Sequence, residues 1–261
     1  MRIAMIQMEV KAGDKDRNIS HARTMLTEAA AKADVLVLPE MWTVGYDFRH
    51  LDEQACMPGD ELLVSLEEWA IQHKKYVVAG SLPTRESGQL YNRSYLYGPQ
   101  GELGAYDKLH LFSLLAEPRR FAAGNRMTLV RMGDMTVGSS ICYDVRFPEM
   151  YRRMAADGAD LVVIPAEWPT TRLEAWNCLV RARAMENQIY VCAVNAVGTY
   201  RGNVFAGHSC LIAPGGEYIA RAGSEETIIY GIYEGEKLKT TRAHMSVWQD
   251  RRTDIYGDVK E

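Results

Sequence analysis

Short apolar runs recur along the chain and alternate with segments of helical period. The runs at residues 34–38 and 161–164 are continuous rather than alternating, and polar or turn residues bound them. Such runs are typical of strands buried on both faces, because neither side carries a polar stripe. Residues 61–73 instead place apolar side chains at 62, 66, 69 and 70, one face of a helix. The chain is therefore expected to be an α/β protein.

The same reading gives the order of elements. Helices are predicted at 18–32, 61–73, 148–156 and 173–187. Strands are predicted at 2–9, 34–38, 76–81, 90–97, 102–106, 127–132, 135–141, 161–164, 190–194, 209–213, 218–221 and 228–233. Residues 111–126 read as a long loop with a helical turn, a length that usually carries function. The tail from 235 has no clear period, so it is either disordered or laid against a partner.

An internal repeat suggests how these elements are arranged. Residues 33–42 resemble residues 159–168, and a helix, an apolar strand and a hairpin follow each of them. Two similar halves predict a four-layer α-β-β-α sandwich of two mixed sheets, related by a pseudo-twofold repeat. No change of composition separates the halves, so residues 1–261 are interpreted as a single domain.

Composition and charge narrow the function. A net charge of -4 gives no basic surface for nucleic acid. Residues 1–9 are too short in apolar length for a signal peptide, and no run approaches the ~20 residues of a membrane span. Five scattered cysteines without a secretory signal indicate reduced thiols and a cytoplasmic location. The histidines and cysteines show no metal-binding spacing, so we expect neither a metal nor a cofactor.

Three reactive side chains follow predicted strands. Glu40 comes after a buried strand, Lys108 after the second strand of a hairpin, and Cys142 at the end of a third strand. Ligand sites form at strand ends in open α/β sheets. A cysteine can attack an amide or nitrile carbon, a carboxylate can take and return the proton, and a lysine can stabilise the oxyanion and favour ionisation of the thiol. Together these groups predict acyl transfer through a thioester.

Other readings of these residues remain open. A buried cysteine is more often a packing residue than a nucleophile. His110 and His208 are alternative bases, which would make the protein a Cys–His hydrolase. Arg146 is expected to hold the turn after Cys142 through an ion pair with an acid. The remaining cysteines, at 56, 178, 192 and 210, are expected to be packing residues.

Three motifs, taken together, resemble the nitrilase or carbon–nitrogen hydrolase superfamily. They are Leu38-Pro39-Glu40 with Gly45-Tyr46, residues 106–112 (YDKLHLF) and residues 141–149 (ICYDVRFPE). The resemblance covers about residues 1–235. It implies a Glu40–Lys108–Cys142 triad, a further active-site carboxylate at Glu117, and an oxyanion hole completed by the backbone N–H of Tyr143. It also implies an α-β-β-α fold, usually assembled as a homodimer or a higher homo-oligomer, with the tail from 235 at a candidate dimer interface.

A finer resemblance concerns the substrate. Residues 166–176, 182–188 and 205–209 look like the ω-amidase branch, whose members hydrolyse 2-oxoglutaramate and similar small amides of 2-oxo acids. Trp168 is either a wall of the substrate pocket or a core aromatic. Arg172 either binds a substrate carboxylate or only pairs with a nearby acid. Tyr46 either hydrogen-bonds substrate or belongs to the core. The alternatives are an aliphatic amide or N-carbamoyl amino acid hydrolase, or a catalytically idle binding protein on this fold.

Overall fold

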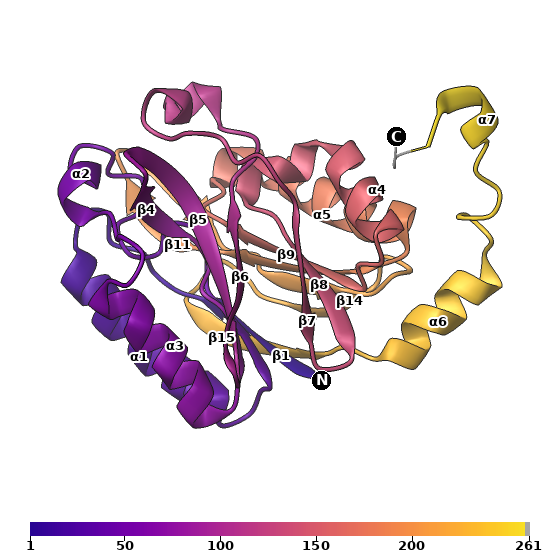
Figure 1. Ribbon diagram of the computed structural model, residues 1–261, viewed down its shortest axis with the longest axis horizontal. Coiled ribbons are helices and arrows are strands. Elements are labelled where there is room, and N and C mark those ends of the chain that lie inside the picture. Colours follow the sequence, from indigo (N-terminus) through magenta and orange to yellow (C-terminus); the bar gives the residue numbers. More distant parts are fainter. Residues whose placement is uncertain (259–261) are drawn as a thin grey trace.

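Two mixed β-sheets pack face to face, and helices cover the outer face of each (Figure 1). The computed structural model describes residues 1–258. The four-layer α-β-β-α sandwich predicted from the sequence is confirmed. The last three residues of the predicted tail, 259–261, lie outside the described residues.

Each sheet combines parallel strands at its centre with antiparallel neighbours. The first has the order β15-β1-β2-β3-β5-β4, with β6 also paired to β5; the second has the order β14-β13-β10-β9-β8-β7. The strands of the first sheet are β1 (Arg2–Gln7), β2 (Val35–Val37), β3 (Tyr76–Val78), β4 (Leu82–Glu86), β5 (Gln89–Gly98), β6 (Gly101–Asp107) and β15 (Thr227–Ile232). Those of the second are β7 (Thr128–Met132), β8 (Met135–Ser139), β9 (Leu161–Ala166), β10 (Tyr190–Asn195), β13 (Cys210–Ile212) and β14 (Tyr218–Arg221).

Helices occupy the two outer layers and the C-terminal segment. Helices α1 (Lys15–Ala30) and α3 (Glu61–His73) cover the first sheet, while α4 (Pro148–Ala156) and α5 (Leu173–Asn187) cover the second (Figure 1). The remaining short elements are α2 (Leu51–Gln54), α6 (Gly235–His244), α7 (Thr253–Tyr256), and the 3-10 turns η1 (Ser113–Leu115), η2 (Glu117–Arg119), η3 (Cys142–Arg146) and η4 (Thr170–Arg172). No helix within residues 1–258 has the length and apolar character to cross a bilayer.

The continuous apolar runs are explained by burial on both faces. In β2, Val35 and Val37 pack between the sheets, whereas Leu36 packs under the helices of the first outer layer. In β9, Leu161 and Val163 pack between the sheets, and Val162 packs under α4 and α5. Because successive strand residues point to opposite faces, both faces need apolar side chains. The two strands that the sequence repeat predicts to be equivalent are therefore buried in the same way.

Two segments differ from the prediction. Strand β4 and the hairpin of β11 (Val197–Tyr200) and β12 (Asn203–Ala206) were not predicted. The tail includes a regular helix that packs against the rest of the chain: α6 buries the side chain of Leu238. Arg242 donates hydrogen bonds to the carbonyls of Ala159 and Gln188, so polar contacts anchor this segment. The expectation of disorder was therefore wrong for residues 235–258, whereas contact of this segment with a partner stays a prediction.

Candidate active site

Cys142 lies in a strained turn directly after the second sheet's β8. Its φ is 45°, in the left-handed region that residues other than glycine rarely adopt. The buried carboxylate of Asp144 holds the turn: Oδ2 accepts from the backbone N–H of Ile141 at 2.9 Å and from the Tyr106 hydroxyl at 2.7 Å. Such strain persists only where the surroundings impose it, and it is common at functional sites. The turn fixes where the thiol points.

Arg146 does not hold this turn. The expected ion pair is wrong, because no acid within residues 1–258 pairs with Arg146. Its guanidinium instead lies over the Trp168 ring, 5.0 Å from the centroid. Asp144, two residues earlier, takes the structural role and also accepts from the backbone N–H of His110 at 3.0 Å.

The predicted carboxylates meet the predicted lysine inside the protein. Lys108 Nζ donates to Glu40 Oε1 at 2.8 Å and to Glu117 Oε1 at 2.9 Å, and none of the three side chains is exposed. Glu40 follows β2, Lys108 follows β6, and Glu117 lies in η2 of the long loop. The other oxygen of Glu117 accepts from the backbone N–H of Phe112 at 2.7 Å. The two buried carboxylates therefore share one cation, and each also accepts further N–H or O–H hydrogen bonds, as burial of polar groups requires.

Further donors fix both oxygens of Glu40. Its Oε2 accepts from the Tyr46 hydroxyl at 2.8 Å and from the backbone N–H of Glu167 at 3.0 Å. Asn92 Nδ2 donates to Oε1 at 2.9 Å. Glu40 and Cys142 also influence each other's pKa, the thiol lowering that of Glu40 and the carboxylate raising that of Cys142. Groups that belong to or follow strands of both sheets thus fix the orientation of the Glu40 carboxylate.

The electrostatic balance favours charges on Glu40 and Lys108. Burial opposes ionisation of Glu40, but the Lys108 ammonium and the hydrogen bonds from Lys108, Cys142 and Tyr46 outweigh it, so the pKa of Glu40 lies below its ordinary value. Burial likewise opposes charge on Lys108, and Glu117, Glu40 and Cys142 together raise its pKa well above the usual range. Burial raises the pKa of Glu117 despite the attraction of Lys108.

The thiol itself is held in its protonated form. Burial, followed by the negative charge of Glu40, raises the pKa of Cys142 well above its ordinary value, although Lys108 acts in the opposite direction. The sequence-based expectation that Lys108 promotes ionisation of the thiol is right in sign, but burial and Glu40 outweigh it. Cys142 therefore needs a base when it attacks, and Glu40 is the adjacent ionised carboxylate.

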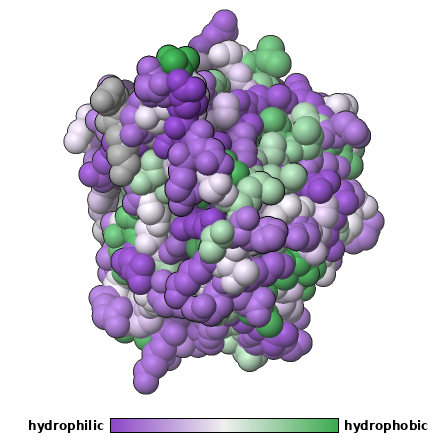
Figure 2. All heavy atoms as spheres, turned by 90° about the vertical axis from the view of Figure 1, so that its right-hand side faces the viewer, coloured by the Kyte–Doolittle hydropathy of each residue, from purple (hydrophilic) through white to green (hydrophobic). Residues whose placement is uncertain are grey.

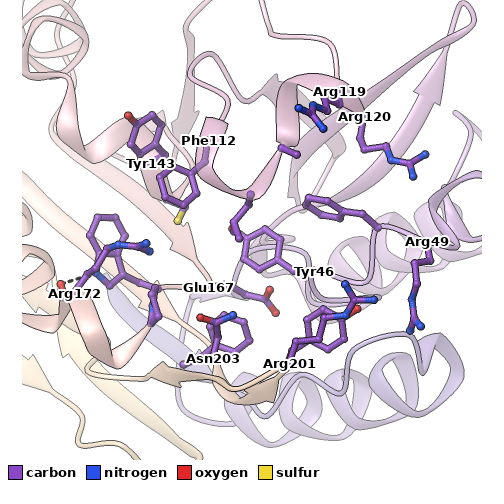
Figure 3. A pocket seen from close by; sticks show the side chains of 18 of the residues that line it. Tyr46, Arg49, Phe112, Arg119, Arg120, Tyr143, Glu167, Arg172, Arg201 and Asn203 are labelled. Carbon is purple, nitrogen blue, oxygen red and sulfur yellow. Dashed lines mark hydrogen bonds between the residues drawn. The ribbon is translucent and has the colours of Figure 1, made fainter.

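A cavity of about 430 Å³ opens above Cys142 (Figure 3). Its lining includes Cys142, Tyr143 and Glu167, together with aromatic side chains and six arginines, at positions 49, 119, 120, 146, 172 and 201. Within residues 1–258, only Arg49 of these six pairs with a carboxylate, that of Asp47 at 2.7 Å. The cavity therefore presents unpaired cations to an anionic ligand.

The predicted substrate residues all lie in this cavity. Tyr46 lines it while bonded to Glu40. Trp168 is 3% exposed and lines the cavity, and its Nε1 donates to the carbonyl of Arg172 at 2.7 Å. It is therefore both a wall of the pocket and a buried core aromatic. The Arg172 guanidinium lies 5.2 Å from the Phe112 ring centroid and pairs with no acid in the described chain. Tyr143 lies against Phe112, with ring centroids 4.8 Å apart.

Neither of the alternative bases, His110 and His208, lines the described cavity. His110 Nδ1 contacts Asp144 Oδ1 at 2.8 Å, and its ring stacks on Phe147 at 3.6 Å. His208 donates its backbone N–H to Gly223 and does not line the cavity. The geometry therefore does not favour a Cys–His hydrolase. Among residues 1–258, no cluster of three or more histidine, cysteine or acidic side chains has the geometry of a metal site.

Sequence reasoning missed Glu167 and Asn92. Glu167 is 2% exposed, lines the cavity, and comes directly after β9. The internal repeat carried a signal, because Glu40 and Glu167 both follow the equivalent strands β2 and β9, although they lie one position apart when residues 33–42 are aligned with 159–168. Asn92 lies within β5, and its contact with Glu40 depends on sheet packing that no local pattern reveals.

Comparisons with known proteins agree on the family to which the chain is similar. A family model described as carbon-nitrogen hydrolase matches residues 2–242. A Bacillus subtilis protein named 2-oxoglutaramate amidase is 37% identical over 255 residues, covering 97% of this chain and 98% of the relative. The human omega-amidase NIT2 is 33% identical over 267 residues, covering 98% and 96%.

Solved structures share the fold. A CN-hydrolase superfamily protein from Xanthomonas campestris, with an arsenic adduct in its active site, superposes with a TM-score of 0.91 at 29% identity, covering 96% of this chain and 97% of that one. An amidase variant from Nesterenkonia sp. AN1, with the acetamide moiety of fluoroacetamide on its active-site cysteine, gives 0.86 at 26% identity, covering 98% and 95%.

Proposed function

The chain belongs to the carbon–nitrogen hydrolase family, and on that premise we propose that it hydrolyses the ω-amide of a small 2-oxo dicarboxylic acid and releases ammonia. The substrates proposed are 2-oxoglutaramate and 2-oxosuccinamate. No metal or cofactor enters the proposed reaction. The electrostatic interaction of Cys142 with the buried Glu40–Lys108 pair, together with the position of Cys142 in the wall of an arginine-lined cavity, carries the proposal.

In the first half-reaction, Cys142 Sγ attacks the amide carbon while Glu40 takes the thiol proton. The developing oxyanion is stabilised by Lys108 Nζ and the backbone N–H of Tyr143, each worth about 3–4 kcal/mol in a site that excludes water. Glu40 then returns the proton to the amide nitrogen, the C–N bond breaks, and ammonia leaves. A thioester between Cys142 and the acyl group remains.

In the second half-reaction, water attacks the thioester. Glu40 takes a proton from the water, the same oxyanion site stabilises the second tetrahedral intermediate, and the C–S bond breaks. The proton returns to the Cys142 sulfur, and the carboxylic acid leaves. Glu117 is a positioning residue in this scheme, because its hydrogen bond fixes Lys108 Nζ beside Glu40.

The arginines support an anionic substrate. Within residues 1–258, five arginines of the cavity have no carboxylate partner: Arg146 and four that Figure 3 labels, Arg119, Arg120, Arg172 and Arg201. An ω-amide of a 2-oxo acid carries one carboxylate away from the scissile bond, and a guanidinium can bind it with two hydrogen bonds. The relatives named 2-oxoglutaramate amidase and omega-amidase point to the same substrate class. Arg172, close to Trp168, is the proposed carboxylate ligand.

An ammonia-release assay on a substrate panel tests the proposal. The panel contains 2-oxoglutaramate, 2-oxosuccinamate, L-glutamine, butyramide, an N-carbamoyl amino acid and a nitrile. We expect the highest kcat/KM for a 2-oxo ω-amide. Faster turnover of butyramide or the carbamoyl compound would replace the proposal by the corresponding hydrolase activity. Absence of both turnover and a covalent adduct on Cys142 across the panel would indicate a binding protein.

We further propose that the protein acts as a cytoplasmic homodimer. Figure 2 shows the face that carries the C-terminal segment, on which hydrophobic residues are scattered among hydrophilic ones. In this segment Met245, Ile255 and Tyr256 are exposed. Burial of these apolar side chains would favour association through the segment. Light scattering after gel filtration, repeated with a chain ending at residue 244, tests this: a monomer in both cases would contradict it.

A further inference from the structure

Glu167 is a buried carboxyl group that the proposed catalytic steps do not use. It is 2% exposed, and neither side-chain oxygen has a hydrogen-bond partner within residues 1–258. The side chain points into the cavity between Tyr46 and Asn203 (Figure 3). Leaving a buried polar group unpaired costs about 1–3 kcal/mol, so native proteins rarely do it without a reason.

The surroundings favour the neutral form of this carboxyl. Burial, followed by the negative charge of Glu40, raises the pKa of Glu167 well above its ordinary value, and the opposing attraction of Lys108 is smaller. Lys108 is already engaged by Glu40 and Glu117, so it does not bind Glu167. A neutral carboxyl offers one O–H donor and one carbonyl acceptor. Glu167 therefore presents an unused donor to whatever fills the cavity.

Building on the proposed 2-oxo ω-amidase activity, we propose that Glu167 determines specificity by donating a hydrogen bond to the 2-oxo oxygen of the substrate. The amide carbon must reach Cys142, and the carboxylate is drawn to the arginines. The 2-oxo group lies between these two ends of the molecule. Among the described cavity residues, Glu167 is the one buried polar side chain whose polar atoms contact no protein group.

This donor would distinguish substrates that differ at one carbon. Glutaramate has the amide and the carboxylate of 2-oxoglutaramate but a methylene in place of the 2-oxo carbon, so it offers no acceptor. L-Glutamine has an ammonium there, which a neutral carboxyl does not attract as a charge. A site built to hydrogen-bond one group discriminates against the analogue that lacks it.

The test compares kcat/KM for 2-oxoglutaramate, glutaramate and L-glutamine in the wild type, Glu167→Ala and Glu167→Gln. Glu167→Ala is expected to lose at least about tenfold on 2-oxoglutaramate, with less than about threefold change on glutaramate. Glu167→Gln keeps an N–H donor of similar length and should retain most of the preference. The exposed Glu174→Gln is the matched control and should leave all three values unchanged.

A pH series separates recognition from a structural role. The ratio of kcat/KM for 2-oxoglutaramate to that for glutaramate cancels titrations that affect both substrates. Glu40, Lys108 and Tyr46 are the titratable groups facing Glu167. As rising pH removes the proton of Glu167, the wild-type ratio should fall. In Glu167→Gln, which cannot lose a proton, the ratio should stay flat.

The outcomes distinguish this inference from the proposed function. If the wild type does not hydrolyse 2-oxoglutaramate, the proposed function fails and this inference with it. If the wild type hydrolyses 2-oxoglutaramate but Glu167→Ala lowers kcat/KM equally for 2-oxoglutaramate and glutaramate, Glu167 only supports Glu40. In that case the inference alone is overturned. A selective loss on L-glutamine would also overturn it, since Glu167 would then bind an ammonium. Should Glu167→Ala show no folding transition, the pH series on Glu167→Gln decides: a ratio that falls as in the wild type overturns the inference.

Discussion

Lys108 and Glu40 are 68 residues apart in sequence, yet their side chains form an ion pair of 2.8 Å with no solvent exposure on either partner. A buried ion pair adds little net stability, because desolvation offsets the attraction. Breaking such a pair is costly, since it leaves a buried charge uncompensated. The burial of this pair therefore supports the proposal that it serves catalysis rather than stability.

Lys108→Met should both destabilise the fold and abolish activity. It leaves Glu40 and Glu117 buried together without a cation, which we expect to cost about 3–5 kcal/mol at pH 7. Urea unfolding measures the loss, and turnover is measured below the transition. Lys239→Met, which removes an exposed pair with Glu236, is the control and should unfold as the wild type does. Equal stability of the two variants would contradict this account.

Cys142→Ala should lose ammonia release by at least about 10³-fold, because Cys142 is the one cysteine among the described residues that line the cavity. Mass spectrometry should detect an acyl adduct in the wild type and none in the variant. Cys178→Ala removes an exposed thiol outside the cavity and should keep wild-type turnover. Wild-type activity in Cys142→Ala would rule out the mechanism.

Glu40→Gln should separate thiol ionisation from catalysis. Burial and then the charge of Glu40 raise the pKa of Cys142, so removing that charge should move the thiol pKa down. The midpoint of the iodoacetamide alkylation rate against pH should therefore shift to lower pH. Amide turnover should fall by about 10³-fold, since the base is absent. A midpoint that moves up would show that Glu40 promotes ionisation of the resting thiol.

Gly124→Ala should impair the site through the backbone. A Cβ at residue 124 would lie 2.2 Å from the carbonyl oxygen of Asp107, and the Gly124 N–H donates to the carbonyl of Lys108. The segment that carries Lys108 would have to move, and a misplacement of 1 Å can cost about 100-fold in rate. A Cβ at Gly223 meets no atom within 4 Å, so Gly223→Ala is the matched control. Equal kcat in the two variants would contradict the prediction.

Arg172→Gln should raise KM for 2-oxoglutaramate by about tenfold, because a guanidinium–carboxylate bond is lost. Turnover of butyramide, which has no carboxylate, should not change. Arg131→Gln is the control: this exposed arginine contacts Thr136 and the carbonyl of Gly133, outside the cavity. A similar change in KM for both substrates would show that Arg172 supports the cavity wall and does not bind the substrate carboxylate.

The elements that the sequence did not predict lack the regular apolar pattern of a strand or a helix. Strand β4 contains Pro83 and ends in Arg85 and Glu86, and it tolerates them because it is an edge strand. The β11–β12 hairpin exposes Asn203 and Val204, so it has no apolar alternation to read. Helix α6 is anchored by Leu238 and by Arg242 rather than by an apolar stripe.

The sequence by itself determined the layers and the reactive groups. Strands buried on both faces must be apolar throughout, and the order of Glu40, Lys108 and Cys142 at strand ends is a local pattern. Only the tertiary structure decided the contacts among them, the gathering of six arginines around one cavity, and the unpaired state of Glu167. The reason is physical: those properties depend on distances and burial between segments far apart in the chain, which packing of the two sheets fixes.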